Sequence, residues 1–175
     1  NDTVGVHWGH AVCDEAPGFT YIYGLGQGKP YVARVPNGDV LAPWEFFTGT
    51  AWSNDPNDAN PMVDFMGSEQ FTVFKYGDEY VYVSQAGGFS KEVVSFTSDK
   101  PYAGWINKQL LFLAEPPVTD SNLFVYNAVA HPQFMKDDRL LVSYNVNSFV
   151  LGDVFKDARK YRPIFYRVPM GLILE

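Results

Sequence analysis

A pattern of short strands recurs about every 60 residues along this 175-residue chain, and it limits the folds that the chain can adopt. Each repeat opens with an apolar run that contains small or polar residues, which suits a strand lining a crowded channel. The three opening runs are Val6–Cys13, Gln70–Tyr76 and Val125–Phe134. A turn and an aromatic, β-branched strand follow each run, so every repeat is expected to begin as a hairpin.

Two further strands can be read in most repeats. Third strands are expected at Tyr31–Pro36, Glu92–Ser98 and Pro163–Pro169, and fourth strands at Pro43–Phe47 and Gln109–Glu115. The last repeat has no clear fourth strand, only the C-terminal sequence GLILE. Repeating four-stranded units predict an all-β fold of the β-propeller class, in which each blade buries its faces against its neighbours.

The blades are expected at about residues 4–50, 66–116 and 123–170 of one partial propeller domain, 1–175. An immunoglobulin-like sandwich is the alternative, but it gives no reason for an internal repeat. A closed propeller usually needs at least four blades, and this chain supplies about three. Three explanations are open: missing N-terminal blades carried elsewhere or on a companion chain, an assembly of several copies, or a shorter β fold. The abrupt start at Asn1 favours the first.

The composition narrows the classes of partner. The chain has 20 acidic and 13 basic residues, a net charge of -7 and a pI near 4.9. It therefore lacks the positive surface that nucleic acids and anionic membranes attract, and neutral ligands are favoured. No apolar run approaches the roughly 18 residues that span a bilayer, and no signal peptide is visible. No cofactor is expected, because GLGQGKP is followed by a strand and not by the helix that a nucleotide site needs.

Aromatic residues make up 17% of the chain, and exposed aromatic rings are the usual platforms for sugar rings. Most of them are expected to pack the blades. Trp44 and Trp105 occupy similar places ahead of the fourth strands, which indicates repeat packing. Trp8 lies beside Gly9 on an inner strand, and Trp52 lies in a polar loop. These two tryptophans are therefore candidates for ligand contact.

At this point the chain resembles a known family. The segment AVAHPQFMKDDRLLVSYNVN with RPIFYRVP after it, PWEFFTGTAW in the first repeat and FTVFKYGDEYVYVSQ in the second carry the likeness. They resemble the C-terminal part of bacterial five-bladed propellers classed as domains of unknown function. Some relatives of that family are glycoside hydrolases that cleave arabinan internally. The resemblance implies about three four-stranded blades of a five-bladed propeller, with a site at the mouth of the central channel.

The resemblance also points to one carboxylate. Glycosidases need two carboxyl groups flanking the scissile bond, and part of that pair would lie on missing blades. In several family members a glutamate precedes the run that opens the corresponding blade. That position is Gln70 here, and Glu69 is one residue earlier. Because side chains alternate in a strand, only one of the two faces the channel unless a bulge intervenes. Glu69 is the candidate catalytic residue, and Gln70 is a ligand-binding candidate if the protein only binds.

Two histidines are candidates for ligand binding. His131 precedes a proline in an inner strand, and the resemblance implies a polar group lining the channel; a structural histidine is the alternative. His10 follows Gly9, where a ligand can approach closely. Strand alternation predicts that His10 and Trp8 share one side and that His7 faces the other. No metal site is predicted, because no HxH or HxxxH pair and no adjacent aspartate is present.

Three more polar residues form a candidate cluster. Asn145 and Asn147 alternate on one strand and so share a face, and Arg162 lies in a turn beside it. They are predicted to close the blade or to bind a glycan. The oxygen-rich loop 54–60 lacks the glycine and the distal glutamate of a calcium-binding EF-hand loop. Cys13, the lone cysteine, is predicted to be a buried, inert thiol.

These patterns lead to one functional hypothesis with two alternatives. The chain is expected to be an extracellular or periplasmic glycoside hydrolase-like propeller that acts on a neutral, arabinan-like polysaccharide or oligosaccharide. The alternatives are a carbohydrate-binding propeller without activity and a structural interaction module. Paired carboxylates at the channel mouth would favour hydrolysis, whereas amides and aromatic rings without paired acids would favour binding.

Overall fold

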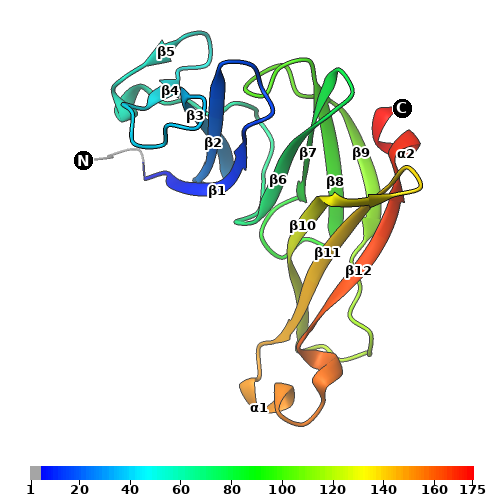
Figure 1. Ribbon diagram of the computed structural model, residues 1–175. Coiled ribbons are helices and arrows are strands. Elements are labelled where there is room, and N and C mark those ends of the chain that lie inside the picture. The colour runs from blue at the N-terminus through cyan, green and yellow to red at the C-terminus, as the bar shows by residue number, and fades with distance from the viewer. Residues whose placement is uncertain (1–4) are drawn as a thin grey trace.

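The first of three antiparallel sheets forms the N-terminal part of the fold (Figure 1). The computed structural model describes residues 5–175, so position 4, the expected start of the first blade, lies outside the described residues. The strands of this sheet follow the order of the sequence: β1 (His7–Cys13), β2 (Phe19–Gly26), β3 (Lys29–Pro36), β4 (Glu45–Phe47) and β5 (Trp52–Ser53). The two-residue strand β5 extends the sheet beyond the expected four strands.

The other two sheets have the same simple meander. The second contains β6 (Phe71–Tyr76), β7 (Glu79–Gln85), β8 (Glu92–Ser98) and β9 (Ile106–Leu113). The third contains β10 (Leu123–Lys136), β11 (Arg139–Ser148) and β12 (Arg162–Pro169). In each sheet every strand pairs with the next along the chain, which is the topology of a propeller blade.

The helices are short and lie at the edges of the sheets. They are α1 (Leu151–Val154), α2 (Met170–Leu174) and the 3-10 turns η1 (Pro56–Asp58) and η2 (Ala158–Lys160). The C-terminal GLILE sequence forms most of α2, which packs against β8 and β9 instead of adding a strand to the third sheet. Between residues 5 and 175, no helix has the length and apolar character needed to cross a membrane.

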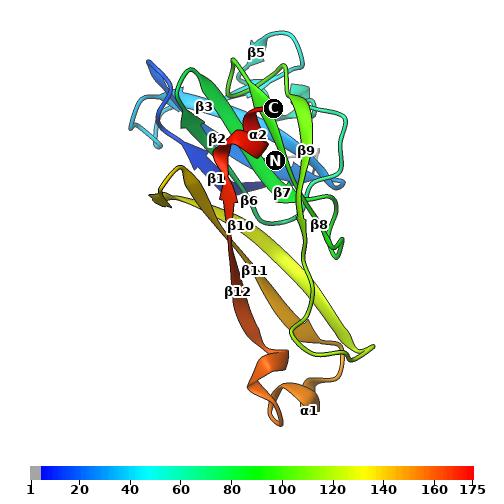
Figure 2. The ribbon, with the colours of Figure 1, turned by 90° about the vertical axis from the view of Figure 1, so that its right-hand side faces the viewer.

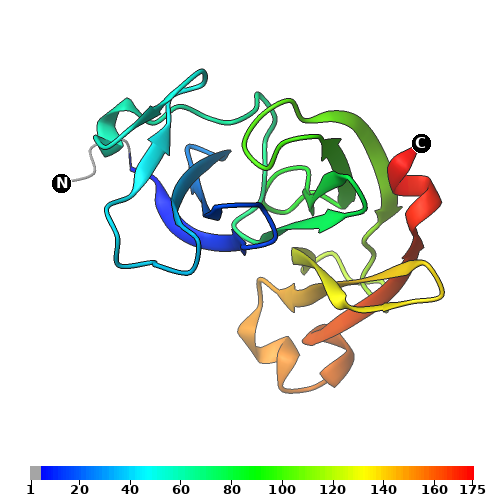
Figure 3. The same ribbon diagram turned by 45° about the horizontal axis from the view of Figure 1, so that its top comes forward.

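The first strands of the three sheets, β1, β6 and β10, lie next to one another (Figure 3). Contacts near the two ends of each neighbouring pair show that these strands run in the same direction. The contacts are His10–Glu69 and Lys75–Glu15 for β1 and β6, and Thr72–Ala130 and Tyr76–Asp138 for β6 and β10. Inner strands that run side by side in one direction are the arrangement of blades around a propeller axis.

The core lies between the sheets, and β7 shows why. Its sequence EYVYVSQ is buried at six successive positions. Tyr80 and Tyr82 pack toward the first sheet, whereas Val81 and Val83 pack toward the third sheet. A strand with both faces covered needs apolar residues at every position and not only at alternate ones. The second sheet is therefore the middle blade of the three.

A buried glutamine joins the second sheet to the third. The strand β10 has a bulge near Asn127, whose φ is 55°, and this bulge takes backbone groups out of the pairing with β11. Gln85 fills the gap, because its Oε1 accepts from the N–H of Ala128 at 3.1 Å. Its Nε2 donates to the carbonyl oxygens of Ser90 and Val125 at 2.6 and 3.4 Å. The contact between these two blades is thus specified by hydrogen bonds as well as by apolar packing.

The all-β, partial-propeller prediction is confirmed. Three antiparallel sheets packed in series exclude the alternative sandwich, which has two. The third sheet and α1 extend away from the first two sheets (Figures 1 and 2). One face of the third sheet packs on the second, and the other is open to solvent, with Phe165 57% exposed.

Candidate functional site

A groove of about 590 Å³ lies where the inner strands β1, β6 and β10 meet. Its lining residues are Ala11, Val12, Glu15, Phe71, Thr72, Val73, Phe74, Lys75, Val129, Ala130, His131, Pro132, Gln133 and Met135. The groove is therefore shared by all three sheets.

His131 is the titratable ring in this groove. Its Nε2 lies 2.8 Å from the hydroxyl oxygen of Ser143 on the neighbouring strand β11. Partial burial lowers the pKa of His131, so the imidazole is neutral near pH 7. A neutral imidazole offers one donor and one acceptor, which suits a sugar hydroxyl. His131 lies in the groove lining, and its role in ligand binding remains a prediction.

Two other polar groups of the groove are held by the backbone. The hydroxyl of Thr72 donates to the carbonyl of Ala130 at 3.2 Å and accepts from its N–H at 3.0 Å. Glu15 accepts from the N–H of Lys75 at 2.8 Å. Glu15 is the carboxylate in the groove lining, and the sequence reading did not identify it because it lies in the turn after β1. A single carboxylate in the lining does not make the acid pair that a glycosidase requires.

A second cluster lies at the edge of this groove, where His7, His10 and Glu69 meet. Their potential ligand atoms all lie within 4.8 Å of one another. The Nε2 of His10 is 3.3 Å from a carboxylate oxygen of Glu69, and the rings of His7 and His10 are 6.5 Å apart and nearly parallel. The ring of His10 also lies 6.3 Å from that of Phe71, which lines the groove.

A bulge in β1 brings the two histidines together. Trp8 pairs with Gly24 and Ala11 with Tyr23, so β1 carries two extra residues between neighbouring positions of β2. Gly9, one of the two, has a φ of 92°, which glycine adopts readily. The expectation that His10 and Trp8 share one side was therefore wrong, since simple alternation does not hold across a bulge.

The cluster also shows why no metal site was predicted from the sequence. That prediction rested on histidine spacing and on the lack of an adjacent aspartate, and His7 and His10 do not form an HxH or HxxxH pair. The third side chain, Glu69, comes from the neighbouring sheet and is 59 residues away from His10. The third histidine, His131, is not part of the cluster.

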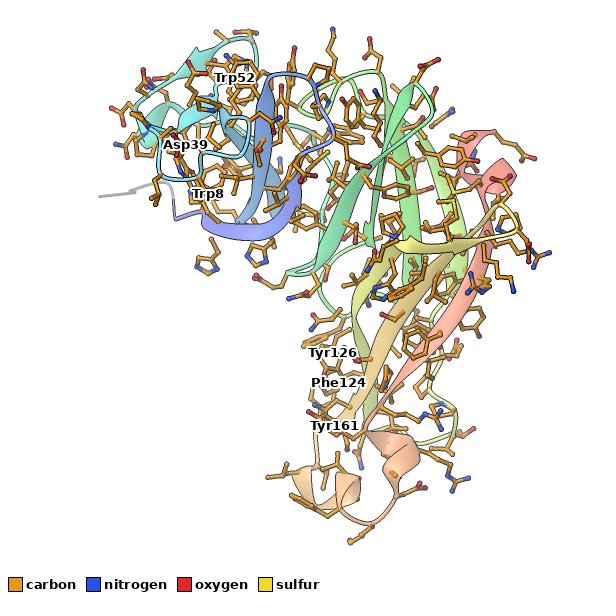
Figure 4. All side chains as sticks on the ribbon, viewed as in Figure 1. Trp8, Asp39, Trp52, Phe124, Tyr126 and Tyr161 are labelled. Carbon is orange, nitrogen blue, oxygen red and sulfur yellow. The ribbon has the colours of Figure 1, made fainter. Side chains whose placement is uncertain are left out.

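The two candidate tryptophans both pack against other side chains of the first sheet. Trp8 is half-buried, and its ring lies 5.4 Å from that of Phe46 and 6.1 Å from that of Trp44. Trp52 is also half-buried, with the guanidinium of Arg34 4.1 Å above its ring. Both residues lie on the first sheet (Figure 4) and outside the groove lining. Their ligand contacts remain a prediction.

Asn145 and Arg162 come together in a smaller groove of about 210 Å³ on the third sheet, with Tyr126 and Tyr161. Asn145 lies opposite Tyr126, and Asn147 lies opposite Phe124, so these four side chains share one face. Figure 4 shows Phe124, Tyr126 and Tyr161 gathered at one end of this sheet, away from Trp8 and Trp52. The sequence analysis missed these rings, although Phe124 and Tyr126 alternate at the start of the third expected blade, 123–170.

Gln70 and Glu69 precede β6 and are both exposed. The side chain of Glu69 turns toward His10, as the 3.3 Å contact shows. The role of Glu69 as a catalytic acid and the role of Gln70 in ligand binding remain predictions.

Comparison with solved structures gives one close likeness. A protein from Bacteroides ovatus, described as a "putative hydrolase", is 26% identical with a TM-score of 0.82. The alignment covers 93% of this chain and 45% of that protein, so the chain spans less than half the length of its relative. A search of curated proteins found no match.

Two glycoside hydrolases are more distant. A thermostable family-43 glycoside hydrolase is 15% identical, with a TM-score of 0.46, covering 96% of this chain and 56% of that one. The GH43 protein BlXynB from Bacillus licheniformis is 12% identical, with a TM-score of 0.30, and the alignment covers 85% of this chain and 38% of that protein. Likenesses this weak do not bear on the activity of this chain.

The family of the chain follows from its sequence. A family model described as a domain of unknown function, DUF5005, matches residues 1–170. Because this match covers almost the whole length, the chain belongs to the DUF5005 family.

Proposed function

We propose that this chain is part of a glycoside hydrolase-like propeller and binds a neutral oligosaccharide or polysaccharide, arabinan-like, in the groove between β1, β6 and β10. The observation that carries the proposal is the groove itself, which all three inner strands build. Its volume of about 590 Å³ is in the range of small-molecule sites, about 300–1,000 Å³. The net charge of -7 disfavours a polyanionic ligand.

The polar groups in the groove suit hydroxyl recognition. Since the Nε2 of His131 contacts Ser143, its Nδ1 is the nitrogen that would meet a sugar hydroxyl. Glu15 provides a charged acceptor whose backbone contact with Lys75 fixes its position. Pro132 and Val12 provide apolar surface for the C–H face of a sugar ring.

Calorimetric titration with neutral oligosaccharides, arabino-oligosaccharides first, tests this proposal. His131→Leu removes the imidazole from the large groove and is expected to weaken binding about fivefold, since one net hydrogen bond contributes about 1 kcal/mol. Asn145→Leu is the matched control, because Asn145 is also a half-buried polar residue of the third sheet but lies in the smaller groove. The Asn145→Leu variant should bind the oligosaccharide as tightly as the unchanged protein.

Other outcomes would reject the large groove. If Asn145→Leu abolished binding and His131→Leu left it intact, the sugar would bind in the smaller groove beside Tyr126 and Arg162. If no neutral sugar bound, a structural interaction module would be the better description of the chain.

Hydrolysis is a second candidate function, favoured by the structural likeness to the Bacteroides ovatus protein described as a "putative hydrolase". Glu15 in the groove and Glu69 at its edge are the carboxylates that this chain would contribute. If only one of them reacts, the second acid would come from further blades. At saturating arabinan, release of reducing ends should fall at least about 100-fold in Glu15→Gln if Glu15 is an acid–base group. If Glu15 only binds the sugar, this saturating rate should hold and the KM should rise.

A larger assembly belongs to the same proposal. We infer that the open face of the third sheet packs against a further blade, so that a five-bladed ring is completed by other segments or by a companion chain. An extracellular or periplasmic location fits an enzyme or binder of polysaccharides. Intact mass of the purified material together with light scattering tests the assembly: a lone 19.7 kDa monomer that binds sugar would contradict it.

A further inference from the structure

We propose that His7, His10 and Glu69 bind a divalent first-row transition-metal ion, with Zn²⁺ as the best match. Two imidazoles and one carboxylate are a donor set that zinc accepts, with a fourth position left for water or a ligand. The proposal does not depend on sugar binding, because none of the three residues lines the large groove.

The tautomer of His10 supports a cation at this position. Its Nδ1 hydrogen-bonds to the backbone carbonyl oxygen of Glu69. A carbonyl oxygen can only accept, so the proton of the neutral ring must lie on Nδ1. The Nε2 then carries a lone pair. Metal-binding histidines commonly donate their other ring N–H to a carbonyl in this way, which fixes the ring and makes the free nitrogen more basic.

That lone pair faces another acceptor. The Nε2 of His10 lies 3.3 Å from a carboxylate oxygen of Glu69. Two acceptors at this distance repel each other unless a cation lies between them. The cation can be a metal ion or a proton on Nε2, and the experiment below separates the two.

His7 provides the third ligand atom and favours the metal. All three potential ligand atoms lie within 4.8 Å of one another, whereas ligands about 2.0–2.1 Å from zinc are separated by no more than about 4.2 Å. A small movement closes this difference. Both His7 and Glu69 are exposed, the latter with 60% of its side chain accessible, so their side chains are free to move. A proton shared by His10 and Glu69 gives no role to His7.

The site would join two blades. His7 and His10 come from β1 in the first sheet, and Glu69 precedes β6 in the second sheet. The open coordination position would lie beside the large groove, because Phe71, next to His10, lines that groove.

Zn²⁺ titration of chelator-treated protein, followed by calorimetry at pH 7.5, tests the proposal. The expected result is one ion per chain. His10→Ala and His7→Ala should each weaken binding at least about 100-fold, since loss of partners that only support ligands already costs about 10- to 100-fold. Co²⁺ should show the absorption of a four- or five-coordinate ion, which is a readout that does not require activity.

Two controls keep the result specific. His131→Ala removes a histidine outside the cluster and should leave the Zn²⁺ affinity unchanged. Circular dichroism of each variant checks that it folds; if His10→Ala does not fold, Glu69→Gln and His7→Ala at the exposed positions give the same test. No binding, or binding that survives both His7→Ala and Glu69→Gln, would overturn the metal site and leave the protonated His10–Glu69 ion pair as the explanation.

Discussion

Replacing Gln85 with leucine should destabilise the junction between the second and third sheets. Gln85 is fully buried, and so is Ala128, whose N–H it accepts. Leucine has a similar size, so little cavity results, but the N–H of Ala128 loses its partner and so does the carbonyl of Ser90. A buried polar group left without a partner costs about 1–3 kcal/mol, so the Ala128 N–H alone predicts a loss of about 2 kcal/mol. The Ser90 carbonyl adds less, because it is only partly buried and water can replace its partner. For a chain of this size a loss of about 2 kcal/mol lowers the melting temperature by about 4–8 °C.

Urea unfolding followed by far-UV circular dichroism measures this loss. Gln70→Leu is the matched control, because it makes the same chemical change at an exposed position before β6. It should alter the free energy of unfolding by less than about 0.5 kcal/mol. If Gln85→Leu were as stable as Gln70→Leu, the hydrogen bonds across the β10 bulge would not stabilise the junction. A change in the slope of the urea transition would instead show that the substitution alters cooperativity.

Three further predictions follow from single residues. Burial raises the pKa of the Cys13 thiol to about 11, so native protein at pH 8 should react with a thiol reagent much more slowly than urea-unfolded protein; equal rates would contradict this burial. Gly24→Ala places a Cβ 2.7 Å from a backbone oxygen of β1 and should cost about 1–3 kcal/mol in a thermal melt, whereas Gly88→Ala, with open space, should be nearly neutral. Hydrogen bonds from Arg159 lower the pKa of Asp157 to about 2, below its unfolded value; the stability from this pair should therefore be present above about pH 4 and lost as the pH falls toward 2, and an NMR titration giving an ordinary value would refute it.

The strands could be predicted because their sequence pattern is local. Each hairpin in the repeats has a turn with Gly or Asp between two runs of aromatic and β-branched residues, and these turns fix the register. The match to a family of unknown function agrees with the resemblance carried by residues 128–147. Local pattern does not fix how many blades a closed ring would contain.

The C-terminal segment shows the limit of such reasoning. Five residues of GLILE are too few to distinguish a strand from a helix by periodicity. The segment becomes the helix α2 because Met170 and Ile173, three positions apart, both reach the core between the second and third sheets. Likewise, Trp52 lies in the strand β5 because it pairs with Phe47. The polar residues around Trp52 predicted a loop and gave no sign of this pairing.

The candidate site was harder to predict than the fold, because it depends on irregular inner strands. Both β1 and β10 have a register shift, at Gly9 and near Asn127, and both residues have a positive φ. By contrast, β6 pairs with β7 without interruption. Sequence reasoning treated all three as regular strands and assigned faces by alternation, which placed His7 and His10 on opposite sides.

The same irregularities supply two of the polar contacts between the blades. At the β1 bulge, His10 turns toward Glu69 of the second sheet, and at the β10 bulge the N–H of Ala128 reaches Gln85 of the same sheet. At the β10 bulge, a regular pairing would use the N–H of Ala128 within the blade and leave it unavailable to Gln85. Polar groups between the blades are therefore expected wherever glycine or asparagine interrupts the first strand of a repeat. Applied to this chain, that expectation would have identified both His10 and the contact of Gln85 with β10. Each bulge changes the hydrogen bonds of its own sheet and also provides a polar contact to the neighbouring sheet.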